Sequence, residues 1–92
     1  MTARRPDANQ AELVATLREH GAHVQDVSSA RPSVGFDLIV ARDGVVYLVE
    51  VKVDARAKLT AREKLVHHAY QAVGVTIHRV ETAEDVERML KI

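Results

Sequence analysis

The stretch FDLIVARDGVVYLVEVKV, residues 36–53, decides the fold. It contains two runs rich in β-branched and apolar residues, 36–42 and 45–53, separated only by Asp43-Gly44. An Asp-Gly pair between two such runs is a strong signal for a β-hairpin with a two-residue turn. The stretch therefore predicts two antiparallel strands that pair directly with each other.

The register of this hairpin brings three charged residues together. A two-residue turn makes Arg42 face Val45, and counting back along both strands places Asp37 opposite Glu50. Residues paired in this way have Cβ atoms roughly 4.5–5.5 Å apart. Because side chains alternate along a strand, Lys52 lies on the same face as Glu50.

Two carboxylates placed face to face suggest a bound cation. Like charges directly opposite each other destabilise a strand pair, and partly desolvated carboxylates raise each other's pKa unless a cation neutralises them. Mg²⁺ takes one or two carboxylates together with waters and substrate phosphate. We expect Lys52 to orient or deprotonate a water or to hold the scissile phosphate. The alternative is a structural ion pair between Lys52 and the two acidic residues.

The remaining sequence predicts helices on both sides of the hairpin. Capping residues and apolar periodicity predict helices over residues 7–20 and 60–73 and a last helix from Thr82. Further strands are expected over residues 22–28 and 75–80. Asp7, Thr60 and Thr82 are the expected N-caps. The order α-β-β-β-α-β-α predicts an α/β fold in which helices flank a four-stranded mixed sheet.

Size and composition restrict the functional classes. The chain has 92 residues, enough for a single domain spanning 1–92. It has no cysteine, which excludes disulfides and Cys-based metal sites and favours a cytoplasmic setting. No apolar run is long enough to span a membrane. Thirteen basic and thirteen acidic residues cancel, so attraction to nucleic acid must come from a local basic rim.

The hairpin also carries a family resemblance. Gly35-Phe-Asp37-Leu-Ile-Val followed by Tyr47-Leu-Val-Glu50-Val-Lys52-Val resembles the PD-(D/E)xK nuclease signature. Within that superfamily the chain resembles archaeal-type Holliday junction resolvases and small phage nucleases of the virus-type replication-repair (VRR-NUC) class. The resemblance covers nearly the whole chain. It implies a restriction-endonuclease-like core and a Mg²⁺-dependent DNA endonuclease, with Mn²⁺ as a substitute ion.

The resemblance also assigns roles within the site. It makes Asp37 and Glu50 metal ligands, adds the carbonyl of Val51 as a further ligand, and makes Lys52 catalytic. The family often has Glu in the first helix where this chain has Gln10. Gln10 either contributes its amide oxygen to the catalytic metal site or only caps its helix. The other departures are Phe36 in place of Pro and Glu63 in place of the Gln common in the phage group.

Contacts to DNA are expected outside the metal centre. The candidates are basic or hydroxyl residues in the N-terminal arm, in the loop before Asp37 and beside the second helix: Arg4, Arg5, Ser28, Arg31, Lys58 and Arg62. All five histidines are expected to have surface or core roles, since none shows zinc-ligand spacing. The scarcity of aromatic residues argues against a single-strand binder that stacks bases.

The functional expectation is an endonuclease for branched DNA, with four-way junctions as the model substrate. A junction has symmetry-related strands, so we expect a two-fold homodimer. A flap or nicking nuclease of the same fold is one alternative. A catalytically inactive module that binds DNA or protein is another, and the neutral net charge and Gln10 favour it.

Overall fold

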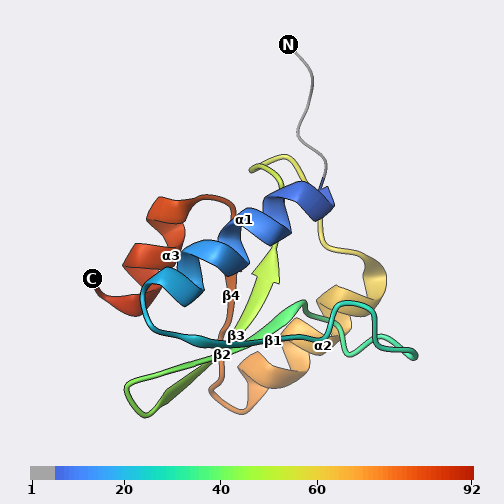
Figure 1. Cartoon of the computed structure of the whole chain (residues 1–92). Coiled ribbons are helices and arrows are strands. Elements are labelled where there is room, and N and C mark those ends of the chain that lie inside the picture. Colours follow the sequence, from blue (N-terminus) through green and yellow to red (C-terminus); the bar gives the residue numbers. More distant parts are fainter. Residues whose placement is uncertain (1–5) are drawn as a thin grey trace.

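The helices and strands follow the predicted order (Figure 1). The computed structural model describes residues 6–92, with side chains from Ala8 onward. The elements are α1 (Pro6–Glu19), β1 (His23–Asp26), β2 (Leu38–Arg42), β3 (Val45–Val51), α2 (Ala61–Ala72), β4 (Ile77–Val80) and α3 (Ala83–Leu90). The strands are each two or three residues shorter than predicted, although Asp37 and Lys52, just beyond the strand ends, still bond to neighbouring strands.

The four strands form one mixed sheet in the order β1-β2-β3-β4. The first three are antiparallel, and β4 runs parallel to β3. Asp43 and Gly44 both have positive φ, 51° and 80°, as a type I′ turn requires. Arg42 pairs with Val45 and Leu38 with Val49, so the predicted hairpin register is confirmed.

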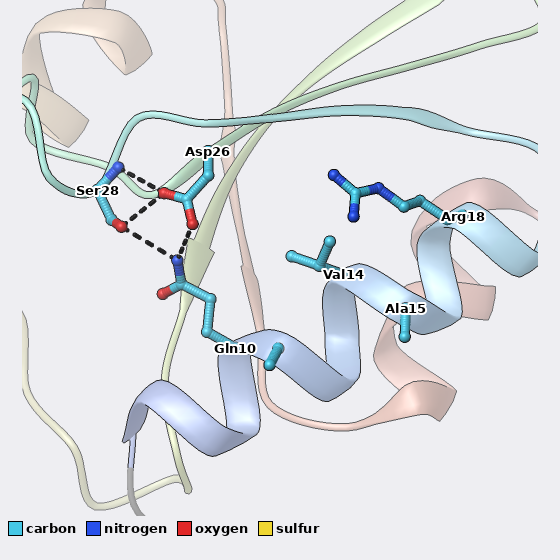
Figure 2. Close-up of a pocket in the computed structure, with 7 residues that line it drawn as sticks. Gln10, Val14, Ala15, Arg18, Asp26 and Ser28 are labelled. Carbon is cyan, nitrogen blue, oxygen red and sulfur yellow. Dashed lines mark hydrogen bonds between the residues drawn. The ribbon is translucent and has the colours of Figure 1, made fainter.

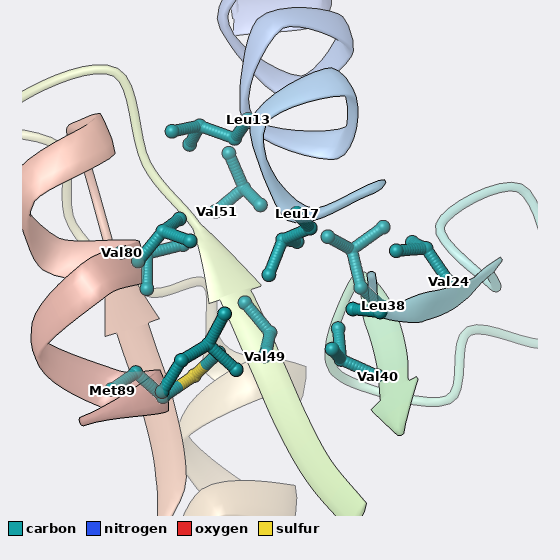
Figure 3. Packing of buried hydrophobic residues seen from close by; sticks show 12 residues of the cluster. Leu13, Leu17, Val24, Leu38, Val40, Val49, Val51, Val80 and Met89 are labelled. Atoms are coloured by element: carbon teal, nitrogen blue, oxygen red, sulfur yellow. The ribbon is translucent and has the colours of Figure 1, made fainter. Parts of the chain in front are cut away.

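Helices α1 and α3 cover one face of the sheet, and α2 lies on the other (Figure 1). Figure 3 shows the core on the α1 and α3 side, where leucines of α1 meet valines of the sheet and Met89 of α3. Its fully buried members include Leu17, Leu38, Val40, Val49 and Val86. Burial of each such side chain stabilises the fold by about 1.5–3 kcal/mol.

On the face of the sheet covered by α2, the helix packs closely against the segment before β2, and the described residues form no deep apolar core there. Gly35 has φ +88°, and a Cβ there would overlap the side chain of Val66 in α2. Next to it, the rings of Phe36 and Tyr70 meet edge to face at 6.1 Å between centroids. These contacts seat α2 on the segment that precedes β2, which carries Asp37.

Two of the three predicted caps are confirmed. Thr60 with Glu63 and Thr82 with Asp85 form complete capping boxes at the starts of α2 and α3. The predicted cap at Asp7 is wrong, because α1 already includes Pro6 and Asp7 lies inside the helix. None of the helices among residues 6–92 is both long and apolar enough to cross a membrane.

Candidate active site

The hairpin backbone holds the Asp37 carboxylate in place. Asp37 lies one residue before β2, and its backbone N–H donates to the carbonyl of Val49 at 2.9 Å. The backbone N–H of Val51 donates to Oδ2 of Asp37 at 2.8 Å. Val51 was predicted to act through its carbonyl, whereas its observed contact is through its N–H. The side chain of Asp37 is thus fixed toward the end of β3 that carries Glu50.

Glu50 is the buried acid of the site. Its side chain is 1% exposed, and its Oε2 has no hydrogen-bond partner within the described chain. Burial, followed by the neighbouring carboxyl groups of Asp37 and Glu63, raises its pKa to about 9, while Lys52 opposes the shift. Near neutral pH this carboxyl group holds a proton unless a cation takes the proton's place.

Lys52 lies between two glutamates. Its Nζ is 3.0 Å from Oε1 of Glu63 and 3.5 Å from Oε2 of Glu50. Burial works to lower the pKa of Lys52, but the bond to Glu63 and the nearby carboxylates outweigh it and raise the pKa. The pKa of Glu63 is lowered: burial opposes ionisation, but the Thr60 N–H and Lys52 overcome it. Lys52 is therefore a charged ammonium group.

Helix α2 contributes two residues to the site, of which one was unexpected. The role of Glu63 was left open by the sequence, and every histidine was expected to be structural. His67 instead places its Nε2 3.2 Å from Oε1 of Glu50. Burial is the main cause that lowers the pKa of His67. The expectation for the histidines is thus corrected at His67, which lies in the site.

A third residue, Asn9 of α1, secures the strand that carries the site. Its side chain is almost fully buried, and its Nδ2 donates to the carbonyl of Lys52 at 3.0 Å. The same group lies 3.4 Å from the carbonyl of Glu81, just beyond β4. Asn9 therefore ties α1 to the ends of the two parallel strands, and its neighbour Gln10 does not share this position.

Gln10 belongs to a separate polar cluster (Figure 2). Its Nε2 donates to Oδ2 of Asp26 at 2.9 Å and to Oγ of Ser28 at 3.1 Å. The hydroxyl and backbone N–H of Ser28 in turn donate to Oδ1 of Asp26. These residues line a pocket of about 480 Å³ between α1 and the end of β1. The Gln10 side chain thus bonds to Asp26 and Ser28 instead of capping its helix. It forms no hydrogen bond to Asp37 or Glu50 among the described residues.

The predicted DNA contacts have different surroundings. Arg4 and Arg5 lie outside the described residues. Arg31 folds back so that its guanidinium donates to the carbonyl of Ala30 at 2.8 Å. Arg62 donates to the carbonyl of Ser33, which links α2 to the loop before β2. Lys58 is exposed just before α2.

The donor set fits a hard cation that keeps much of its own water. Among residues 6–92, no group of three or more His, Asp or Glu side chains is placed to hold a metal ion. Asp37 and Glu50 nonetheless offer two carboxylates, and Oε2 of Glu50 is a buried acceptor without a donor. Two carboxylates with water and phosphate suffice for Mg²⁺, which seldom occupies an all-protein cage.

Comparison with known proteins shows the fold. No family model and no curated protein matches the sequence. A solved structure described as a VRR_NUC domain is similar with a TM-score of 0.76 and 23% sequence identity, over 94% of each chain. The chain therefore has the fold of a VRR_NUC domain, and the predicted order of helices and strands around a four-stranded mixed sheet is confirmed.

Proposed function

We propose that this chain is a Mg²⁺-dependent endonuclease that hydrolyses phosphodiester bonds of DNA. The observation that carries the proposal is the convergence of Asp37, Glu50 and Lys52, in which Oε2 of Glu50 is buried without a hydrogen-bond partner in the described chain and lies 3.5 Å from the Lys52 ammonium group. The fold supports it, since the similar solved structure is described as a VRR_NUC domain and the hairpin sequence resembles the PD-(D/E)xK nuclease signature.

Each residue has a distinct role in this proposal. Asp37 and Glu50 would hold the ion through carboxylate oxygens, with the Val51 carbonyl as a further ligand. A bound Mg²⁺ supplies charge neutralisation and lowers the pKa of a water. Because the carboxylates keep Lys52 protonated, we assign it to holding a phosphate oxygen and not to removing a proton. Mn²⁺ would substitute for Mg²⁺.

The substrate that we propose for this enzyme is branched DNA. Lys58 is exposed just before α2, and Arg31 and Arg62 are held by hydrogen bonds to carbonyls of the loop before β2. Such residues contact phosphates and position the nucleic acid without reading its sequence. The protein would act in the cytoplasm of a bacterial or phage-infected cell, on structures that arise in recombination and repair.

A homodimer would bring two such sites to one branched substrate. Several large apolar side chains are exposed on the hairpin and on and after α2, including Val46, Leu65 and Val73. Burial of these side chains at an interface between two chains would remove apolar surface from water and so favour association. The expected two-fold dimer is tested by light scattering coupled to gel filtration, in which a monomer at all concentrations would contradict it.

One observation favours the alternative of an inactive binding module. Lys52 already forms an ion pair with Glu63 at 3.0 Å, and an ion-pair network of this kind needs no metal. Under that alternative the chain binds DNA or protein but cleaves nothing. A flap or nicking nuclease of the same fold differs from the main proposal only in substrate.

A cleavage panel separates these possibilities. Duplex, flap, fork and four-way junction DNA are incubated with Mg²⁺, Mn²⁺ or EDTA. We expect metal-dependent cleavage of branched substrates, at least about 100-fold slower in Lys52→Met and unchanged in the control Arg18→Met on the exposed side of α1. Cleavage of flaps alone would support the flap nuclease. Absence of cleavage in every arm would favour the inactive module.

A further inference from the structure

The two oxygens of the Glu50 carboxyl group have different surroundings. Oε1 lies 3.2 Å from Nε2 of His67, which is hydrogen-bond distance. Oε2 has no hydrogen-bond partner within the described chain, and the ammonium group of Lys52 lies 3.5 Å from it. Oε1 therefore has a hydrogen-bond partner from α2, while Oε2 has the ammonium group of Lys52 nearby and can accept a further cation.

His67 comes from a different element than the rest of the metal site. It belongs to α2, whereas Asp37 and Glu50 belong to the hairpin. The side chain of His67 is 15% exposed, but the next residue, His68, is exposed. Consecutive residues on a helix do not share a face, so only the first of this pair reaches Glu50.

The position of the imidazole is set by how α2 docks. Val66, the residue before His67, lies against Gly35 so closely that a Cβ at Gly35 would overlap it. Tyr70, one turn later, meets Phe36 edge to face. His67 is thus placed by contacts that are independent of the Glu50 side chain and can hold Glu50 in one rotamer.

We propose that His67 is a positioning residue for the metal ion. By holding Oε1 of Glu50, His67 would leave Oε2 as the oxygen that Glu50 offers to the ion. The inference rests on the proposed function, because it concerns the ion bound by Asp37 and Glu50. Loss of a residue that orients a metal ligand typically weakens metal binding about 10–100-fold.

Two amide substitutions isolate the contact. In His67→Gln the amide nitrogen can occupy the place of Nε2 and still donate to Oε1. In His67→Asn the shorter side chain places its amide nearer the position of Nδ1 and cannot reach Glu50. Both variants are polar and uncharged, so their difference reports the Nε2 contact. His68→Asn on the exposed side of α2 is the matched control.

The measurement is Mn²⁺ affinity by titration calorimetry, with urea unfolding in EDTA to verify that each variant is folded. We expect His67→Asn to bind Mn²⁺ about 10–100-fold more weakly than the unchanged chain. His67→Gln should restore the affinity to within about threefold, and His68→Asn should not change it. Equal affinity of His67→Asn and the unchanged chain would overturn this inference alone. Absence of Mn²⁺ binding by the unchanged chain would overturn the proposed function together with it.

Discussion

Lys52 and Glu63 are joined by an ion pair of 3.0 Å that links the hairpin to the first turn of α2. The same oxygen of Glu63 accepts the backbone N–H of Thr60 at 2.8 Å and thereby completes the capping box. The Glu63 carboxylate thus both caps the first turn of α2 and binds the ammonium group of Lys52. Substitutions at Glu63 can separate these two interactions.

Glu63→Gln should keep the cap but remove the charge that faces Lys52. We expect the free energy of unfolding to fall by about 0.5–1 kcal/mol, since a partly buried ion pair is lost. Glu63→Ala also removes the acceptor of the Thr60 backbone N–H, while the Thr60 side chain still accepts the N–H of position 63, and should cost about 1 kcal/mol more. Urea unfolding of both variants at pH 7 checks this. Equal stability of the two variants would show that the bond from the Thr60 N–H to the side chain of residue 63 contributes nothing.

Gly35→Ala should displace α2 from the site. The new Cβ would overlap Val66, and the alanine backbone would have to adopt a positive φ. Gly21→Ala is the matched control, because its φ of +84° is similar but a Cβ there meets nothing within 4 Å. We expect the control to lose about 1–2 kcal/mol of stability from backbone strain, and Gly35→Ala to lose about 1–3 kcal/mol more from overpacking.

Thermal or urea unfolding of these two glycine variants measures the difference. Gly35→Ala should also weaken Mn²⁺ binding, since His67 moves with α2, whereas Gly21→Ala should not. Equal loss of stability in both variants would mean that the contact between Gly35 and Val66 is not tight.

The buried carboxyl group of Glu50 predicts a pH dependence of stability in EDTA. Its pKa rises from the ordinary 4.5 to about 9 on folding, so between these values the folded state holds a proton that the unfolded state has released. Stability from this group is complete below pH 4.5 and is lost as the pH rises toward 9. The slope can reach about 1.4 kcal/mol per pH unit.

The measurement compares the unchanged chain with Glu50→Gln by urea unfolding from pH 7.0 to 8.5. The two proteins contain the same five histidines, so histidine titration contributes equally to both curves. The unchanged chain should lose stability across the window relative to Glu50→Gln, and Mg²⁺ should reduce that loss. Parallel curves for the two proteins would show that Glu50 is ionised throughout.

Gln10→Ala should weaken the fold locally without affecting the metal. Gln10 bonds to Asp26 and Ser28, so its removal should cost about 1 kcal/mol for the lost hydrogen bonds. Mg²⁺ affinity by calorimetry should stay unchanged. A clear loss of Mg²⁺ affinity in Gln10→Ala would show that Gln10 contributes to the metal site.

The hairpin could be predicted from the sequence because its geometry is local. The Asp43-Gly44 turn fixes the register, and the register places Asp37, Glu50 and Lys52 together on one face. The caps at Thr60 and Thr82 were predictable for the same reason, since a segment of four residues, from the N-cap to N3, decides each of them.

The contributions of the helices were harder to predict, because they depend on how the helices dock. Nothing local distinguishes Asn9 from Gln10 as the inward polar residue of α1, and the buried one is Asn9. Glu63 and His67 are four residues apart and so share a face of α2. That spacing was the available signal for His67, but only the close approach at Gly35 brings this face onto Glu50.

The most direct test of the site is titration of the metal-free protein with Mg²⁺ by calorimetry, for the unchanged chain and for Asp37→Asn. Asp37→Asn keeps the size of the side chain and an oxygen that can accept the Val51 N–H, but it removes the charge. We predict a saturable binding signal for the unchanged chain that disappears in Asp37→Asn. Identical titrations of the two proteins, with or without heat, would contradict a metal centre at Asp37 and Glu50.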